Sequence, residues 1–167
     1  MIEVKNEYVK NIKEGLDSLI IGQEELKVVL ILALLTEGNV LIEGPVGVGK
    51  TVTAKVFSML IGGEFKRIQM TPDLLPSDMI GTPFYNVKDG SWSIKKGPIF
   101  ANVLFIDELN RAPARTQSAL LQAMQEREVT IENTTFKLPS PSVVIATQVP
   151  YAEGTYTLPY VEIDRFS

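Results

Sequence analysis

Three runs of consecutive apolar residues divide the chain. They read NVLIE at 39–43, NVLFI at 102–106 and SVVIAT at 142–147. Continuous rather than alternating runs are typical of strands that are covered on both faces. Residues 65–70 (FKRIQM) alternate instead and predict a fourth strand. Because helical patterns separate these segments, the sequence predicts an α/β fold with a mostly parallel sheet flanked by helices.

Helical periodicity fills most of the intervals between the strands. In residues 3–17 the apolar positions recur every four residues, which gives a helix with one apolar face. Residues 23–36 predict a second helix that is apolar on most sides in its later half, so this helix is expected to be buried on more than one face. The remaining helices are expected at residues 50–60 and 116–127, with a short helical turn within 71–81.

Two β-hairpins are expected as insertions in this α/β pattern. Residues 84–87 and 91–95 flank an Asp89-Gly90 turn, a strong hairpin signal. Residues 128–132 and 135–138 form the second predicted hairpin. The segment from 153 to the end is loop-like and becomes helical from Tyr160 in this interpretation.

Composition narrows the chemistry that is available. The length of 167 residues is typical of a single domain. The chain contains neither cysteine nor histidine. Disulfides, thiolate nucleophiles, zinc fingers and histidine acid–base schemes are therefore excluded. The net charge of −4 argues against bulk nucleic-acid binding. The N-terminus does not read as a signal peptide, and the longest apolar run, 28–35, is too short to span a membrane, so a cytoplasmic protein is expected.

The turn after the first strand has the spacing of a phosphate-binding loop. Residues 44–51 read GPVGVGKT and fit G-x-x-x-x-G-K-[ST] between a strand and a helix. Glycines let backbone N–H groups point at an anion, and the following helix adds its positive end. Lys50 would bind the β- and γ-phosphates of ATP, and the hydroxyl of Thr51 would bind Mg²⁺. The candidate nucleotide-binding residues here are Gly44, Pro45, Val46, Gly47, Val48, Gly49, Lys50, Thr51 and Val52.

Two adjacent acids follow the strand at 102–106. Asp107 and Glu108 are expected at the exposed end of this strand, because ionised carboxylates are costly to bury. Asp107 is the candidate Mg²⁺ ligand, acting through the ion's water shell. Glu108 is the candidate base that polarises the water attacking the γ-phosphate.

Several longer segments resemble the MoxR family of AAA+ ATPases. They are IIGQEEL at 20–26, QMTPDLLPSDMIG at 69–81, the stretch 96–131, and ATQVPYAEGTYTLPYVEIDRF at 146–166. The resemblance implies an ATP-driven machine that acts as a homo-oligomeric ring, usually a hexamer, and remodels or matures client proteins. Partners in that family often carry a von Willebrand factor A domain. Residues 1–167 would form the large α/β subdomain alone, without the helical lid with which the family continues.

The resemblance also gives roles to individual positions. Arg165 matches the family's arginine finger, which reaches the ATP of a neighbouring subunit; pairing with a nearby acid is the alternative. Gly22 and Gln23 match the segment that lies over adenine. The two hairpins match insertions that project toward a ring's pore, although their aromatic residues, Trp92 among them, could equally pack the first hairpin.

One position departs from the family pattern. Where the family reads A-T-Q-N-P at its first sensor, this chain has Val149 in place of Asn. Either Gln148 replaces the lost polar group, or hydrolysis is slow while ATP binding survives. The sequence thus favours a Mg-ATPase motor core, with a nucleotide-gated binding module and a DNA-acting ring ATPase as alternatives; the acidic charge weighs against the last.

Overall fold

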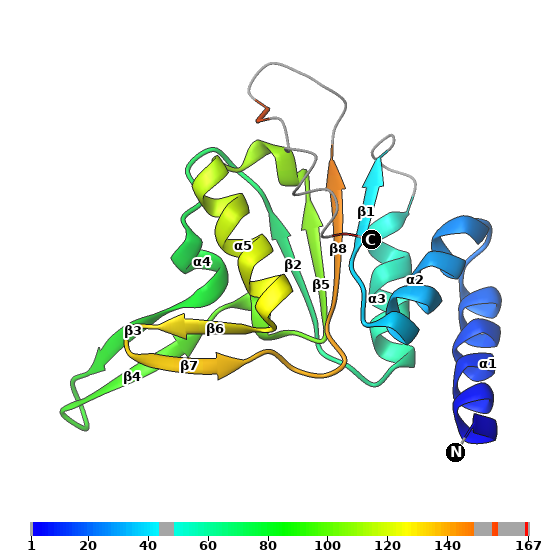
Figure 1. The fold of residues 1–167 in the computed structure, drawn as a ribbon, viewed down its shortest axis with the longest axis horizontal. Helices are drawn as coiled ribbons and strands as arrows, with labels where there is room; N and C mark the ends of the chain where they lie inside the picture. Colours follow the sequence, from blue (N-terminus) through cyan, green and yellow to red (C-terminus); the bar gives the residue numbers. More distant parts are fainter. Residues whose placement is uncertain (1, 44–48, 149–154, 157–165, 167) are drawn as a thin grey trace.

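The centre of the molecule is a parallel sheet of four strands. The computed structural model describes residues 2–43, 49–148, 155–156 and 166. Strands β1 (Val40–Glu43), β8 (Val143–Gln148), β5 (Val103–Asp107) and β2 (Phe65–Gln69) lie side by side in that order, and all three pairings are parallel. The carboxyl ends of the strands therefore meet at one edge of the sheet (Figure 1). The predicted α/β fold is confirmed.

Helices cover both faces of the sheet. Two separate clusters of buried side chains lie between the helices and the strands, one on each face. Strand β5 contributes to both, because Leu104 and Ile106 point to one face and Val103 and Phe105 to the other. Full coverage of both faces explains the continuous apolar run, since burying each large side chain stabilises the fold by about 1.5–3 kcal/mol. The helices are α1 (Ile2–Leu19), α2 (Glu24–Thr36) and α3 (Lys50–Leu60) on the Phe105 face, and α4 (Pro76–Ile80) and α5 (Ala114–Glu126) on the other.

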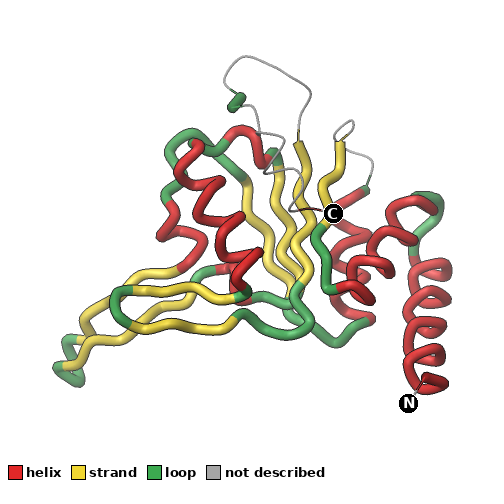
Figure 2. Tube along the Cα trace, in the orientation of Figure 1, coloured by secondary structure: helices red, strands yellow, loops and turns green. Residues whose placement is uncertain are grey.

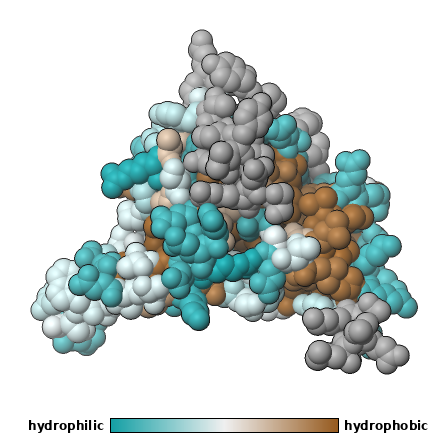
Figure 3. Space-filling model, viewed as in Figure 1, coloured by the Kyte–Doolittle hydropathy of each residue, from teal (hydrophilic) through white to brown (hydrophobic). Residues whose placement is uncertain are grey.

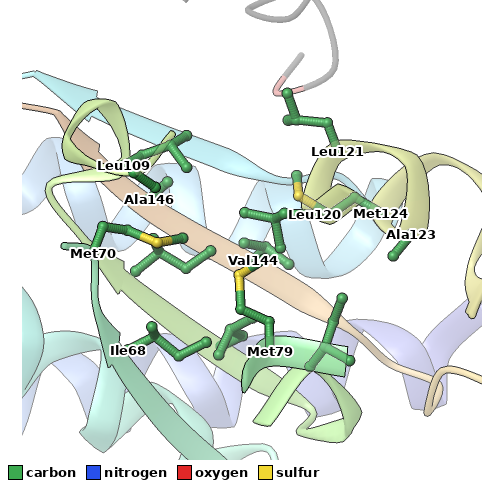
Figure 4. Close-up of a cluster of buried hydrophobic side chains, with 14 of the residues drawn as sticks. Ile68, Met70, Met79, Leu109, Leu120, Leu121, Ala123, Met124, Val144 and Ala146 are labelled. Atoms are coloured by element: carbon green, nitrogen blue, oxygen red, sulfur yellow. The ribbon is translucent and has the colours of Figure 1, made fainter. Parts of the chain in front are cut away.

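The cluster under α4 and α5 connects the helices to the sheet (Figure 4). Met70, Met79 and Leu120 meet there, and all are fully buried. The hydroxyl of Thr116 in α5 donates a hydrogen bond to the Leu74 carbonyl at 2.7 Å, which ties the segment before α4 to the start of α5. Within 71–81 the predicted helical turn is confirmed as α4, while α5 begins two residues earlier than expected.

Two antiparallel hairpins project from the body (Figures 1 and 2). Strand β3 (Gly81–Asn86) pairs with β4 (Ser91–Lys96), and β6 (Glu128–Ile131) pairs with β7 (Thr134–Lys137). Both hairpins were predicted, but β3 begins three residues before the expected start. Its base is crowded: a Cβ at Gly97 would come within 2.1 Å of the Met79 carbonyl oxygen, so only glycine lets β4 pass the end of α4.

The expectation that α2 is buried on more than one face is wrong. Its buried positions, Lys27, Leu30 and Ala33, recur every three residues on a single face. Four large apolar side chains on the opposite side, Val28, Val29, Leu32 and Leu35, are 40–55% exposed, whereas Leu26, Ile31 and Leu34 are partly buried against the core. Figure 3 shows hydrophobic residues gathered over this part of the molecule. Density of apolar residues alone did not reveal which side of the helix faces the sheet.

A buried lysine joins the first two helices. The Lys27 ammonium is 3.2 Å from the Asp17 carboxylate in α1 and 3.0 Å from that of Glu24. Its side chain is only 5% exposed, so the pairing with two carboxylates compensates for the loss of solvent.

The sequence did not indicate the 3₁₀ turns η1 (Pro98–Phe100) and η2 (Leu109–Arg111). The helix predicted from Tyr160 lies outside the described residues.

Candidate functional site

Helix α3 begins at the edge where the parallel strands end. Gly49 precedes it with φ of 84°, a left-handed conformation that favours glycine at this point of the predicted loop. Lys50 and Thr51 form its first turn and are partly exposed, whereas Val52 points to solvent with 58% exposure. The positive end of an eleven-residue helix is thus directed at the sheet edge. The candidate residues Gly44, Pro45, Val46, Gly47 and Val48 lie outside the described residues.

The predicted adenine segment lies against this helix end. The Thr53 hydroxyl in α3 donates to the side-chain oxygen of Gln23 at 3.2 Å. A Cβ added to Gly49 would come within 2.8 Å of the Gln23 amide nitrogen, so the two residues are in close contact. Gly22 and Gln23 both have positive φ, 76° and 57°, and form the turn that brings the segment here. The structure therefore brings together Gly22, Gln23 and the first turn of α3.

The two acids stand where strand β5 ends. Asp107 is its last residue and lies opposite Gln69 of β2 in the ladder. Glu108 follows with φ of 55°, a left-handed conformation that costs a non-glycine residue about 1–3 kcal/mol. The Glu108 backbone N–H donates to the Thr147 hydroxyl of β8 at 3.0 Å, which supports this conformation. The two carboxylates, adjacent in sequence, are both within reach of side chains of β2.

Residues of β2 and η2 hold both carboxylates in place. Arg67 contacts Asp107 Oδ2 through Nε at 2.6 Å and through Nη2 at 2.5 Å. Glu108 Oε2 accepts a hydrogen bond from Gln69 Nε2 at 3.0 Å and forms an ion pair with Arg111, whose Nε is 2.9 Å away. The Asp107 and Glu108 side chains are only 16% and 19% exposed. Both acids are therefore in fixed, charge-compensated positions.

These partners were not identified from the sequence. Arg67 and Gln69 lie about 40 positions before the acids, and only the β2–β5 register brings them close. Their spacing of two places them on the same side of β2, and the alternation in FKRIQM carried that signal. Thr147 similarly reaches the site only through the position of β8 beside β5.

Of the remaining predicted site residues, the described part of the chain includes Gln148. Gln148 is the last residue of β8 and donates its side-chain amide to the Glu43 carboxylate, across the β1–β8 pair. It therefore lies at the same edge as α3 and the acids. Arg165 and Val149 lie outside the described residues.

The donors at this edge suit a hard divalent cation. Thr51 offers a hydroxyl and Asp107 a carboxylate, and Mg²⁺ prefers oxygen ligands. Among the residues described, no group of three acidic, histidine or cysteine side chains is close enough to hold a metal by itself. That donor set fits Mg²⁺ bound together with phosphate oxygens and water, and does not fit an all-protein metal cage.

No helix in the described parts of the chain combines the length and the apolar character that a membrane span requires.

Comparisons with known proteins agree with this arrangement. Residues 39–167 match the ATPase family associated with various cellular activities (AAA). The chain is 49% identical over 149 residues to Chaperone MoxR1 of Mycobacterium tuberculosis, which covers 89% of this chain and 40% of that protein. It is 45% identical over 154 residues to the uncharacterized protein YeaC of Bacillus subtilis, which covers 92% of this chain and 48% of that protein.

A solved structure is similar along nearly the whole chain. The crystal structure of a putative ATPase from Cytophaga hutchinsonii superimposes with a TM-score of 0.84 and 42% identity, over 96% of this chain and 49% of that one. The chain spans less than half the length of each of these relatives. The matched segments include the sheet edge described above. The chain belongs to the AAA ATPase family, and its relatives place it in the MoxR branch of that family.

Proposed function

We propose that this chain binds Mg-ATP and hydrolyses it as the motor core of a MoxR-type remodelling machine. The observation that carries the proposal is the position of Asp107 and Glu108 at the carboxyl end of β5, at the edge where α3 begins. Strand β8 lies between β1 and β5, so its last residue, Gln148, lies beside the carboxyl ends of these two strands. The positive start of a helix, two acids and a polar side chain thus lie at one edge of the sheet, which suits a triphosphate with its divalent ion.

Each residue has a role in this mechanism. In this proposal the phosphates are bound by backbone N–H groups of 44–49 and by the Lys50 ammonium. Gly22 and Gln23 lie against the adenine ring. Thr51 and Asp107 would hold Mg²⁺, and the bound ion would supply positive charge next to the phosphate oxygens. Glu108 would accept a proton from the attacking water as that water forms a bond to the γ-phosphorus, while the bond from the γ-phosphorus to the bridging oxygen breaks and ADP leaves.

Two further groups complete the site in the proposal. Arg165 of a neighbouring subunit would stabilise charge on the transferring phosphoryl group, so that the site is shared within a ring, a hexamer by family analogy. Gln148 would orient the attacking water in place of the Asn that Val149 replaces. Its hydrogen bond to Glu43 keeps the amide at the carboxyl end of β8, at the same sheet edge as the two acids.

The two hairpins support a protein client as the substrate of remodelling. Tyr85 and Trp92 face each other across β3 and β4 with ring centroids 5.4 Å apart, and they are 50% and 73% exposed. Exposed aromatic side chains on a projecting hairpin suit contact with other proteins. The name of the relative Chaperone MoxR1 agrees with this function. A cytoplasmic location and a partner with a von Willebrand factor A domain also belong to the proposal.

Phosphate release measured against protein concentration tests the proposal. Specific activity should rise steeply with concentration in Mg²⁺, because the site is completed between subunits, and EDTA should abolish it. Constant specific activity over a hundredfold range of concentration would contradict a shared site. No Mg²⁺-dependent phosphate release at any concentration would contradict the motor function.

A second candidate function rests on Val149. A residue without a polar group at the sensor position would leave a module that binds ATP and hydrolyses it poorly. Val149→Asn should then raise turnover about tenfold, because a well-placed polar group in a transition-state site contributes that much or more. Unchanged turnover in this variant, with ATP affinity also unchanged, would show that Gln148 already fills the role.

A further inference from the structure

Arg67 forms an ion pair with Asp107 through two of its guanidinium nitrogens. Both Nε and Nη2 of the guanidinium approach a single carboxylate oxygen, Oδ2, at 2.6 Å and 2.5 Å. Arg67 stands two residues before Gln69, the ladder partner of Asp107, so its side chain reaches along the same side of the strand pair. Asp107 is thereby held from the β2 side, within the sheet edge that faces α3.

Burial of the two partners is unequal. The Asp107 side chain is 16% exposed, whereas that of Arg67 is 53% exposed. A carboxylate so far removed from water needs a nearby cation, since an uncompensated charge there is costly. The arginine can turn into solvent without such a cost. Asp107 is therefore the fixed member of the pair, and Arg67 is the member that can be exchanged.

We propose that Arg67 is a positioning residue that holds Asp107 when no metal is bound and is displaced when Mg-ATP binds. The inference rests on the proposed role of Asp107 as a metal ligand. A guanidinium and a divalent cation at one carboxylate repel each other, so the two states exclude one another. Arg67 keeps the carboxylate charge-compensated and correctly directed in the empty protein, and it lowers metal affinity by competing for Asp107.

Calorimetric titration with a non-hydrolysable ATP analogue tests this exchange. The measured quantity is the ratio of the analogue's affinity in Mg²⁺ to its affinity in EDTA. Arg67→Gln should raise this ratio about threefold to tenfold, because the metal no longer has to displace an ion pair. Lys66→Gln is the matched control: it removes the same charge from the neighbouring residue of β2, which is 51% exposed and pairs with Glu64 at 2.9 Å.

Further variants separate the possible outcomes. Asp107→Asn should lower the ratio, and adding Arg67→Gln to it should change nothing more, since the two residues act through one contact. Arg67→Lys, which keeps the charge but loses the double contact, should give a smaller rise than Arg67→Gln, and it serves if the glutamine variant fails to fold. An equal ratio in Arg67→Gln and Lys66→Gln would overturn the exchange while leaving the metal site in place.

Two other results have different meanings. A lower ratio in Arg67→Gln than in the unsubstituted chain would mean that Arg67 assists the bound metal-nucleotide, which overturns competition. Failure of the unsubstituted chain to bind the analogue in either solution would overturn the proposed function and this inference together.

Discussion

The sheet edge and the β3–β4 hairpin hold the side chains proposed to be functional in opposite ways. At the edge, Asp107 and Glu108 are mostly buried and each carboxylate is held by a hydrogen bond or an ion pair from β2. On the hairpin, Trp92 is 73% exposed, and its ring lies beside that of Tyr85 across the strands. Chemistry at a phosphorus atom needs groups fixed to fractions of an ångström, whereas contact with varied proteins needs accessible apolar surface.

The difference extends to how each region is supported. The acids end a strand whose residues Val103 to Ile106 are all buried between two layers of helices. The hairpin is a two-stranded ribbon attached to the body at Gly81 and Gly97, where backbones pass within contact distance. We therefore expect substitutions at the edge to change chemistry, substitutions in the core to change stability, and substitutions on the hairpin to change neither by much.

The largest expected effect is on hydrolysis. Glu108→Gln should keep ATP binding and lower phosphate release about 10²–10⁴-fold, because the amide cannot accept the proton of the attacking water. Glutamine retains hydrogen-bond acceptor capacity toward Gln69 and Arg111, so the fold should not change. Single-turnover phosphate release with calorimetric ATP binding measures both properties. Hydrolysis at the original rate would remove Glu108 as the base.

A stability contrast between core and hairpin comes next. Phe105→Ala should lower the free energy of unfolding by about 3–5 kcal/mol, because it leaves a cavity in a fully buried site. Trp92→Ala should change it by less than about 0.5 kcal/mol, since little of the ring is packed. Urea unfolding followed by circular dichroism measures both. A large loss in the Trp92 variant would mean that the aromatic pair holds the fold instead of serving contacts.

The smallest of the three effects is on nucleotide affinity. Lys50→Ala should weaken ATP binding about 100-fold, because charge-assisted contacts with the phosphates are lost. Lys55→Ala is the control, since this exposed lysine lies on the same helix one turn further along. Calorimetry with both variants decides the matter. Equal affinities would show that the start of α3 does not bind phosphate.

Much of this architecture follows from local patterns. The strands β1, β5 and β8 were predicted because coverage on both faces demands continuous apolar residues. Lys50, Thr51, Asp107 and Glu108 were placed at the site because each stands where a strand or helix begins or ends. Such boundaries are visible in a short window of sequence.

Features that depend on distant segments could not be predicted in the same way. Arg67, Gln69 and Thr147 join the site through strand register across about 40 residues, which no local pattern encodes. The exposed side of α2 was mistaken for a buried one because Val28 and Leu32 are as apolar as Leu30. The side of α2 that packs toward the sheet is determined by the packing of α1 and α3 around this helix.

The aromatic pair on the hairpin has an optical consequence. Trp92 is the single tryptophan of the chain, so all indole fluorescence originates from one ribbon of the molecule. Because the ring is largely in water, its emission should lie at long wavelength and should change little when the sheet unfolds. A partner that covers the hairpin should instead shift the emission to the blue and protect it from iodide quenching. The chain thus carries a native reporter of contact at this surface that is almost insensitive to the state of its core.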